Sequence, residues 1–216
     1  MKTNTKLLLV CIFSIILLLL ILSDVFKGKK ETDELIYIED FLSEDEYKKI
    51  LSLNTDKNTF HNEGYRLIKP LSKDNITYDL FYSNKHMKEI KEKLNNESIK
   101  ESKFPIEHRI YPSDSKGMKW HIDTLMYDIP QYEAIYTIRN LSKSFTGWKD
   151  YDNNYHKIWT KPNSLLIVKA KGFNHHVTPP ISGEREILKL IYTQSDNIND
   201  NYRREMKRFD KIKINE

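Results

Sequence analysis

The residues of this sequence best suited to chemistry form a short motif, His121-Ile122-Asp123. The segment from Lys119 to Asp123 has the pattern of a β-strand, in which residues two apart point to the same side of the pleat. An imidazole and a carboxylate can therefore bind one metal ion, and Asn174-His175-His176, at the end of a later strand and turn, offers a third ligand. Two histidines and one carboxylate on one face of an octahedral ferrous ion leave three positions open, which is what oxygen chemistry requires.

Further residues extend this motif over most of the chain. Tyr111-Pro112 and Gly117 precede it, and His175 is followed ten residues later by Arg185. With this spacing, the region from about Glu34 to Thr193 resembles the Fe(II)/2-oxoglutarate-dependent dioxygenase superfamily and, within it, the prolyl 4-hydroxylase-like branch. A bare His-x-Asp is a weak signal, whereas His-x-Asp followed about 50 residues later by His-x-Val-x-Pro and then Gly-x-Arg is a specific one.

The resemblance implies a role for each residue that matches the family motif. His121, Asp123 and His175 are expected to be the iron ligands and hence the catalytic residues. His175 is preferred over His176 because only His175 has an arginine at the ten-residue offset usual in the family. Arg185 is expected to bind the distal carboxylate of 2-oxoglutarate, a role suited to the planar guanidinium group.

Two further residues and the remaining cofactors also follow from the resemblance. Tyr111 is expected to donate a hydrogen bond to the cosubstrate, and Thr137 is expected to donate to the same carboxylate as Arg185. For both residues the alternative is an ordinary structural role, as a core tyrosine or a strand threonine. The implied cofactors are Fe(II) and 2-oxoglutarate, with dioxygen as the oxidant and L-ascorbate as the reductant that restores over-oxidised iron.

The resemblance implies hydroxylation of an unactivated C–H bond but leaves the substrate open. The segment from Ile36 to Tyr47 is similar to prolyl 4-hydroxylases that act on proline in extended peptides, so a peptide or protein substrate is expected. Arg185 stands where many prolyl 4-hydroxylases have lysine, and Phe145-Thr146-Gly147-Trp148 departs from their common Gly-Gly-Glu-Leu pattern. The alternatives are an oxygenase for another side chain, a small molecule or a lipid, a non-catalytic jelly-roll binding module, and a cupin-type hydrolase or isomerase.

Helices and short strands are expected to position these residues. Glu34 to Phe41 alternates as a strand does, and Ser43 with Glu46 predicts a capping box that begins a helix. A second amphipathic helix is indicated by Met87, Ile90 and Leu94 at helical spacing. The chain closes with a charged helix over residues 202–211, whose basic residues we expect to form a solvated face.

The region beyond Glu107 changes to short β-like runs that are separated by polar or Gly- and Pro-containing connectors. These runs are His108 to Tyr111, Lys119 to Asp123, Tyr132 to Arg139, Lys157 to Thr160, Ser164 to Lys169 and Glu186 to Thr193. The pattern predicts an α+β fold that is mainly β, a double-stranded β-helix or jelly roll with supporting N-terminal helices.

Composition limits the classes of partner and of metal site. The 35 basic and 31 acidic residues are interspersed and give a net charge of +4, so we expect no nucleic-acid partner. The single cysteine, Cys11, lies in an apolar N-terminal run. The rest of the chain therefore has no internal disulfide and no thiolate metal ligand, and any metal must be held by nitrogen and oxygen.

The N-terminal run from Leu7 to Leu22 is apolar except for Ser14, and we expect an uncleaved single-pass transmembrane helix rather than a signal peptide. Residues 1–30 are expected to form this membrane anchor and a juxtamembrane linker, and residues 31–216 the dioxygenase domain. Lysines flank both ends of the run, so the orientation stays open, and with it a location of the domain in the endoplasmic reticulum lumen. The sequence also leaves the oligomeric state open.

Overall fold

The computed structural model describes residues 35–213 of the chain. Within this range no helix is long and apolar enough to cross a membrane. The predicted anchor at residues 7–22 lies outside the described residues.

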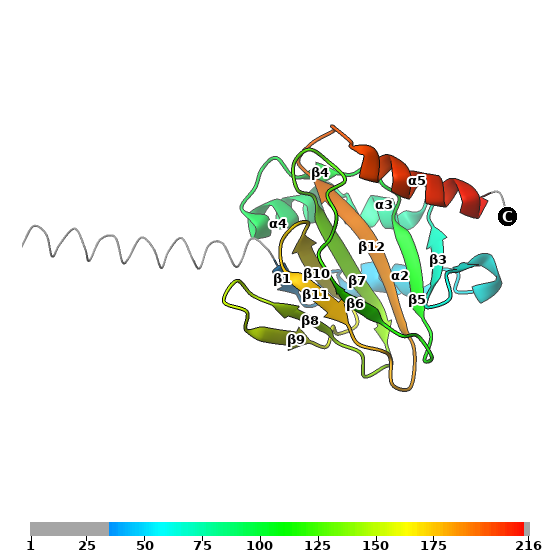
Figure 1. The fold of residues 1–216 in the computed structure, drawn as a ribbon. Coiled ribbons are helices and arrows are strands. Elements are labelled where there is room, and N and C mark those ends of the chain that lie inside the picture. Colours follow the sequence, from blue (N-terminus) through cyan, green and yellow to red (C-terminus); the bar gives the residue numbers. More distant parts are fainter. Residues whose placement is uncertain (1–34, 214–216) are drawn as a thin grey trace, which may run out of the picture. The chain divides into compact units, whose positions relative to one another are not determined.

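The described strands form two antiparallel sheets, with the smaller in front of the larger in Figure 1. The larger sheet contains, in spatial order, β1 (Leu35–Ile38), β10 (Ser164–Lys169), β7 (Tyr132–Asn140), β12 (Arg185–Thr193), β5 (Glu107–Tyr111), β3 (Leu67–Pro70) and β2 (His61–Asn62), and β4 (Lys100–Glu101) pairs with the end of β12. The smaller sheet contains β6 (Met118–His121), β11 (Asn174–Val177), β8 (Thr146–Lys149) and β9 (Tyr155–Ile158). The expectation of a mainly β domain is confirmed, and two antiparallel sheets are compatible with a jelly roll.

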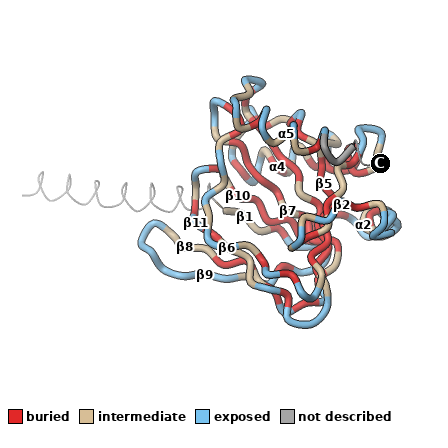
Figure 2. The backbone as a smooth tube through the Cα atoms, turned by 45° about the vertical axis from the view of Figure 1, so that its right-hand side comes forward, coloured by how far each residue is buried: buried red, intermediate tan, exposed pale blue. Residues whose placement is uncertain are grey.

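The central strands of the larger sheet are buried on both faces, as the red tube of β7 and β10 in Figure 2 shows. Alternate residues of β7 therefore meet two environments. Ala134 and Tyr136 belong to the main hydrophobic core, whereas Glu133 and Ile135 point to the other face and line a cavity. The same strand thus supports the core with one set of side chains and builds the site with the other.

Three helices lie behind the larger sheet in Figure 1, α2 (Glu44–Leu51), α3 (Ile76–Phe81) and α4 (Asn84–Leu94), with a short 3-10 helix at Lys57–Thr59. The predicted capping box is confirmed, because the Ser43 backbone N–H donates to Glu46 Oε2 at 2.8 Å and the Ser43 hydroxyl accepts from the backbone N–H of Glu46. Phe81 of α3 packs edge to face on Tyr136 of the sheet, with ring centroids 4.9 Å apart. Aromatic contacts of this kind fix the helical layer on the sheet.

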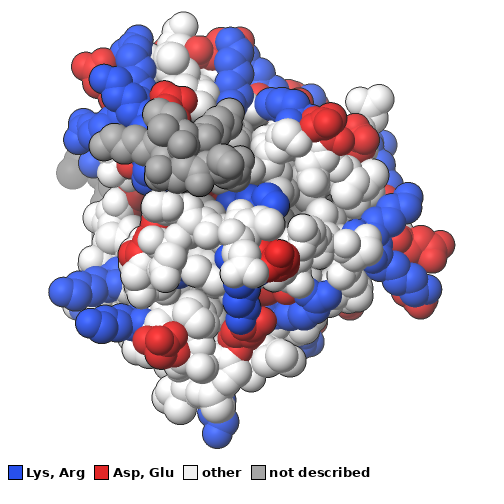
Figure 3. Space-filling view, turned by 90° about the vertical axis from the view of Figure 1, so that its right-hand side faces the viewer, with Lys and Arg blue, Asp and Glu red and all other residues white. Residues whose placement is uncertain are grey.

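The predicted C-terminal helix is also confirmed, as α5 (Asp200–Lys213). It is attached through a second, smaller hydrophobic cluster. In this cluster Phe104 packs against Phe209 and Tyr202, with ring centroids 5.3 and 5.8 Å apart. On the face of the molecule shown in Figure 3, basic and acidic side chains are interspersed, as the balanced composition predicts.

Candidate active site

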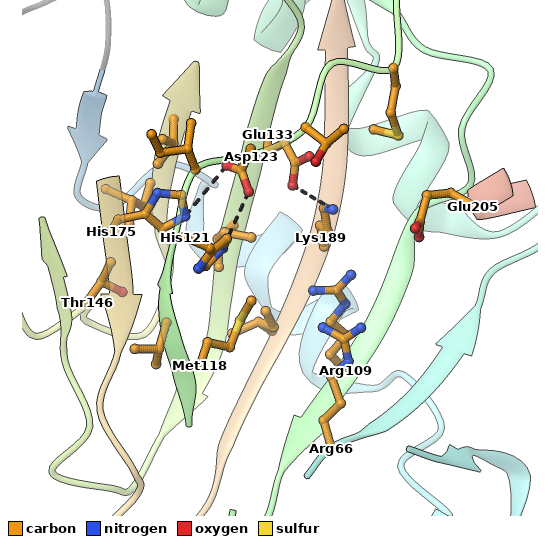
Figure 4. A pocket seen from close by; sticks show the side chains of 18 of the residues that line it. Arg66, Arg109, Met118, His121, Asp123, Glu133, Thr146, His175, Lys189 and Glu205 are labelled. Atoms are coloured by element: carbon orange, nitrogen blue, oxygen red, sulfur yellow. Dashed lines mark ion pairs between the residues drawn. The ribbon is translucent and has the colours of Figure 1, made fainter. Parts of the chain in front are cut away.

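His121, Asp123 and His175 converge at the smaller sheet. Strands β6 and β11 are antiparallel neighbours, and their register places His121 directly opposite His175. Asp123 lies two residues beyond the end of β6, with its carboxylate oxygens 3.5 Å from His121 Nε2 and 3.6 Å from His175 Nε2 (Figure 4). The three ligand atoms all lie within 4.8 Å of one another. Ligands about 2.1 Å from one octahedral ion are about 3 Å apart, so a small contraction would close this set around a metal.

The backbone fixes the orientation of both imidazoles. His121 Nδ1 lies 2.8 Å from the carbonyl oxygen of Lys119, and His175 Nδ1 lies 3.0 Å from that of Phe173. A carbonyl can only accept, so each Nδ1 carries the proton and donates. Each Nε2 therefore faces Asp123, and it is the ring nitrogen left to bind a metal once it carries no proton.

Gly117, the glycine of the sequence motif, holds β6 close to the end of β11. Its φ of +67° is a conformation that side-chain-bearing residues rarely adopt. A Cβ at this position would also collide with the backbone of Val177, Thr178 and Pro179. The glycine therefore permits the close approach that brings the two histidines together.

The ion pairs within the triad shift two pKa values in opposite directions. The hydrogen bond with Asp123 raises the pKa of His121. Burial by itself disfavours the charged form of Asp123, but the hydrogen bond with His121 and the charge of His175 outweigh it and lower the pKa of Asp123. The site therefore favours an ionised carboxylate.

Arg185 lines the same cavity of about 510 Å³ as the triad. It is the first residue of β12, paired in register with Tyr111 on β5, and only 3% of it is exposed. Among the described residues it forms no ion pair, and its Nε has no hydrogen-bond partner, while burial lowers its pKa. A buried, unpaired guanidinium is costly, and a carboxylate bound in the cavity would satisfy it.

Of the two further residues expected to contact the cosubstrate, Tyr111 lines the cavity and Thr137 does not. Tyr111 lines the cavity; burial would raise its pKa, but the neighbouring guanidinium groups of Arg109 and Arg66 outweigh burial and lower it. Thr137 is not among the lining residues, and its hydroxyl donates to Thr160 Oγ1 at 2.9 Å. The structure thus brings Tyr111 into the site and gives the Thr137 hydroxyl a protein partner.

The neighbouring histidine, His176, lies on the opposite side of β11 from the triad. Its ring stacks on Trp120 with centroids 4.2 Å apart, and its Nε2 lies 3.2 Å from the Tyr155 hydroxyl. It is therefore outside the metal cluster.

An ion pair that the sequence analysis did not identify stands beside the triad. Lys189 Nζ lies 2.6 Å from Glu133 Oε2, and both residues line the cavity (Figure 4). Burial raises the pKa of Glu133, the charge of Asp123 adds to this effect, and Lys189 opposes it. The period of two along β12 that runs from Arg185 through Ile187 to Lys189 is the signal that would have found this lysine.

The expectation that the basic residues of the C-terminal helix form a solvated face is wrong for one of them, Arg208 of α5. Its side chain is partly buried, and its Nη2 lies 3.5 Å from the fully buried carboxylate of Glu107 on β5. Arg204, four residues earlier on α5, also lines the cavity but is exposed to solvent.

No family model matches the sequence, and no curated protein matches it. Solved structures do match the fold. An oxidoreductase of the 2OG-Fe(II) oxygenase family from Burkholderia pseudomallei has a TM-score of 0.65 at 9% identity, over 77% of this chain and 87% of that one.

Two other similar structures contain ligands. The first is a prolyl hydroxylase from Trichoplax adhaerens in complex with a hypoxia-inducible-factor oxygen degradation domain peptide, with a TM-score of 0.58 at 17% identity, over 80% of this chain and 89% of that one. The second is HygX from Streptomyces hygroscopicus with nickel and 2-oxoglutarate bound, with a TM-score of 0.54 at 10% identity, over 75% of this chain and 83% of that one. The resemblance drawn from the sequence motifs is thus confirmed at the level of the fold. This chain has the fold of the 2-oxoglutarate/Fe(II) oxygenases, a fold that includes prolyl hydroxylases.

Proposed function

We propose that this protein is an Fe(II)- and 2-oxoglutarate-dependent dioxygenase that hydroxylates an unactivated C–H bond, with a prolyl residue of a peptide or protein as the target. One observation carries the proposal. The cavity that holds two histidines and one carboxylate in ligand geometry also contains a buried arginine with no anionic partner among the described residues. A structural metal site or a non-catalytic binding module has no need for that arginine.

The donor set fits ferrous ion, because two imidazole nitrogens and one carboxylate oxygen are the ligands that non-haem Fe(II) oxygenases use. His121, Asp123 and His175 would hold the metal, and Arg185 would hold the distal carboxylate of 2-oxoglutarate through its free guanidinium edge. Bound iron with 2-oxoglutarate and dioxygen supplies the chemistry in which the cosubstrate is decarboxylated to succinate and the target carbon is hydroxylated. The protein's share is to orient the imidazoles through Lys119 and Phe173 and to keep the cosubstrate site dry.

The oxygenase itself is tested by incubating the full chain with Fe(II), 2-oxoglutarate, ascorbate and oxygen, and by measuring succinate. Slow succinate formation without added substrate is expected, and it should vanish in the variant His121→Ala. The matched control is His156→Ala, because His156 pairs with Asp150 at the surface and does not line the cavity. Equal succinate formation by both variants would overturn the proposal, as would the absence of a ferrous-oxoglutarate absorption band under anaerobic conditions.

A peptide substrate is supported by the Trichoplax prolyl hydroxylase, which has this fold and whose structure contains a peptide. Proline as the target residue is tested by mass spectrometry of a proline-rich peptide library after incubation with the active protein. A gain of one oxygen atom on proline supports it. A gain on another residue, or turnover stimulated only by small molecules or lipids, replaces it.

We also propose that residues 7–22 anchor the protein in a membrane, with the catalytic domain in the lumen of the endoplasmic reticulum. Protease added to sealed membrane vesicles should then digest the domain only after the vesicles are opened by detergent. Digestion of the domain in intact vesicles would place it on the cytoplasmic side.

A further inference from the structure

The wall of the cavity beyond the Glu133–Lys189 pair is lined by guanidinium groups. Four arginines contribute to it: Arg66 before β3, Arg109 on β5, and Arg204 and Arg208 on α5, of which Arg204 is exposed. Arg66 and Arg109 are 5% and 4% exposed. In Figure 4 their guanidinium groups lie together, and both groups lower the pKa of Tyr111. We call Arg66, Arg109 and Arg208 the arginine wall.

Two carboxylates hold the arginine wall from behind. Glu63 Oε2 lies 2.7 Å from Arg66 Nε and Glu63 Oε1 lies 3.0 Å from Arg208 Nη1, while Glu107 Oε2 lies 2.7 Å from Arg109 Nη2 and 3.5 Å from Arg208 Nη2. Neither Glu63 nor Glu107 lines the cavity. The acids therefore fix the arginines in position, and a ligand in the cavity meets the cationic groups. Arg208 Nε is buried and has no hydrogen-bond partner within the part of the chain that the structure describes.

The other cationic groups of the cavity are not available for this role. Arg185 is proposed to bind the cosubstrate, and the charge of Lys189 is balanced one-to-one by Glu133 at 2.6 Å, whereas the three wall arginines share two carboxylates. Asp123 belongs to the metal ligands. Among the described residues that line the cavity, the remaining carboxylate is that of Glu205, which is 45% exposed at the rim and lies 3.4 Å from Arg208.

A purely apolar substrate would gain nothing from such a wall. The three guanidinium groups share the two carboxylates of Glu63 and Glu107, so the wall keeps one positive charge in excess. An unmodified proline ring pressed against the wall would desolvate that charge without compensating it, which would weaken binding. A carboxylate matches the planar donor fork of arginine and forms charge-assisted hydrogen bonds with it. The chemistry of the wall thus favours a substrate that brings its own negative charge.

We propose that the primary substrate carries a carboxylate that binds at the arginine wall, while its target C–H bond lies at the His121–Asp123–His175 triad. The inference rests on the proposed function and deepens it by naming the substrate class. Two sources share this chemistry: an acidic side chain close to the target residue of a peptide, and the carboxylate of a small organic acid.

The test measures binding without turnover. The full chain is loaded with nickel in place of iron and saturated with 2-oxoglutarate, and binding of matched probes is measured by isothermal titration calorimetry. One pair is N-acetylproline and N-acetylprolinamide. The other pair is a blocked pentapeptide with glutamates on both sides of proline and its glutamine counterpart. An acid that binds at least about 10-fold more tightly than its amide identifies the source, because one charge-assisted hydrogen bond is worth about this factor.

Two variants on one helix link the selectivity to the wall. Arg208→Gln, at a position with a 28% exposed side chain, should reduce affinity for the acid probe about 10-fold and leave the amide unchanged. Arg203→Gln is the matched control, since Arg203 pairs with Asp200 at the surface, does not line the cavity, and should leave both affinities unchanged. Arg208→Glu should abolish preference for the acid.

The outcomes separate this inference from the proposed function. Equal binding of acid and amide in both pairs overturns the carboxylate site even when the protein produces succinate. Weaker binding of 2-oxoglutarate rather than of the probe in Arg208→Gln overturns it too, because the wall would then serve the cosubstrate. Selective binding of an acid with no succinate formation leaves the carboxylate site standing and overturns the oxygenase.

Discussion

Replacing Arg185 by methionine should stabilise the protein while disabling it. The guanidinium is 3% exposed and has no ion-pair partner among the described residues, so removing its charge should raise the free energy of unfolding by about 2 kcal/mol. In a domain of this size that corresponds to an increase in Tm of about 4–8 °C. The same change removes two charge-assisted hydrogen bonds to 2-oxoglutarate, each worth about 1.5–3 kcal/mol, so affinity should fall at least about 100-fold.

The matched comparison is Arg109→Met, since Arg109 is 4% exposed but is paired with Glu107. Its removal takes both short hydrogen bonds from the fully buried carboxylate of Glu107, which keeps only the 3.5 Å contact with Arg208, and should lower stability by about 3 kcal/mol. The assay is thermal denaturation of the full chain without metal, followed by titration of nickel and 2-oxoglutarate. A lower Tm for Arg185→Met, or an undiminished 2-oxoglutarate-induced rise in Tm, would refute the reasoning that Arg185 is held unpaired for the cosubstrate.

Two other predictions concern the triad. Gly117→Ala should lower stability by about 3 kcal/mol and weaken nickel binding, because the added Cβ meets the backbone at Val177. The control is Gly64→Ala, at a φ of +86° with open space around it, which should cost only about 1 kcal/mol and leave nickel binding unchanged. Thermal denaturation measures the stability and calorimetry the nickel affinity. The second concerns pH. The pKa of His121 is raised in the folded protein, so its stabilising pair with Asp123 is fully present below about pH 6.5 and is lost as pH rises through the folded-state pKa of His121. The pKa of Asp123 is lowered, so the stability that Asp123 contributes is present above about pH 3.9 and is lost as pH falls through its folded-state pKa. Nickel competes with the proton on His121, so its affinity should rise over the range in which metal-free stability falls; a pH-independent nickel affinity would contradict this.

Much of the metal site could be predicted because its information is local. The spacing within His121-Ile122-Asp123 and the ten-residue offset from His175 to Arg185 are properties of single segments. The sequence predicted that His121 and Asp123 lie in one strand, but β6 ends at His121 and Asp123 lies beyond it. The carboxylate reaches the metal position through the chain that leaves the strand rather than through strand alternation.

Which strands pair with one another in the sheets could not be predicted in the same way. Strands β8 and β11 carry few apolar residues and give no clear alternation, so only pairing with β6 and β9 makes them strands. Sheet order joins segments far apart in the chain, such as β1 with β10. The arginine wall is a set of the same kind, because each arginine alone reads as a solvated residue and only tertiary packing gathers them.

The division of the domain into two hydrophobic clusters has a practical consequence. Strand β12, which begins with Arg185, packs on the main core through Leu188 and Leu190, whereas α5, which supplies Arg208, is attached by the smaller cluster around Phe104 and Phe209. Substitutions in α5 should therefore change the selectivity for acidic substrates while leaving the metal ligands and Arg185 in place.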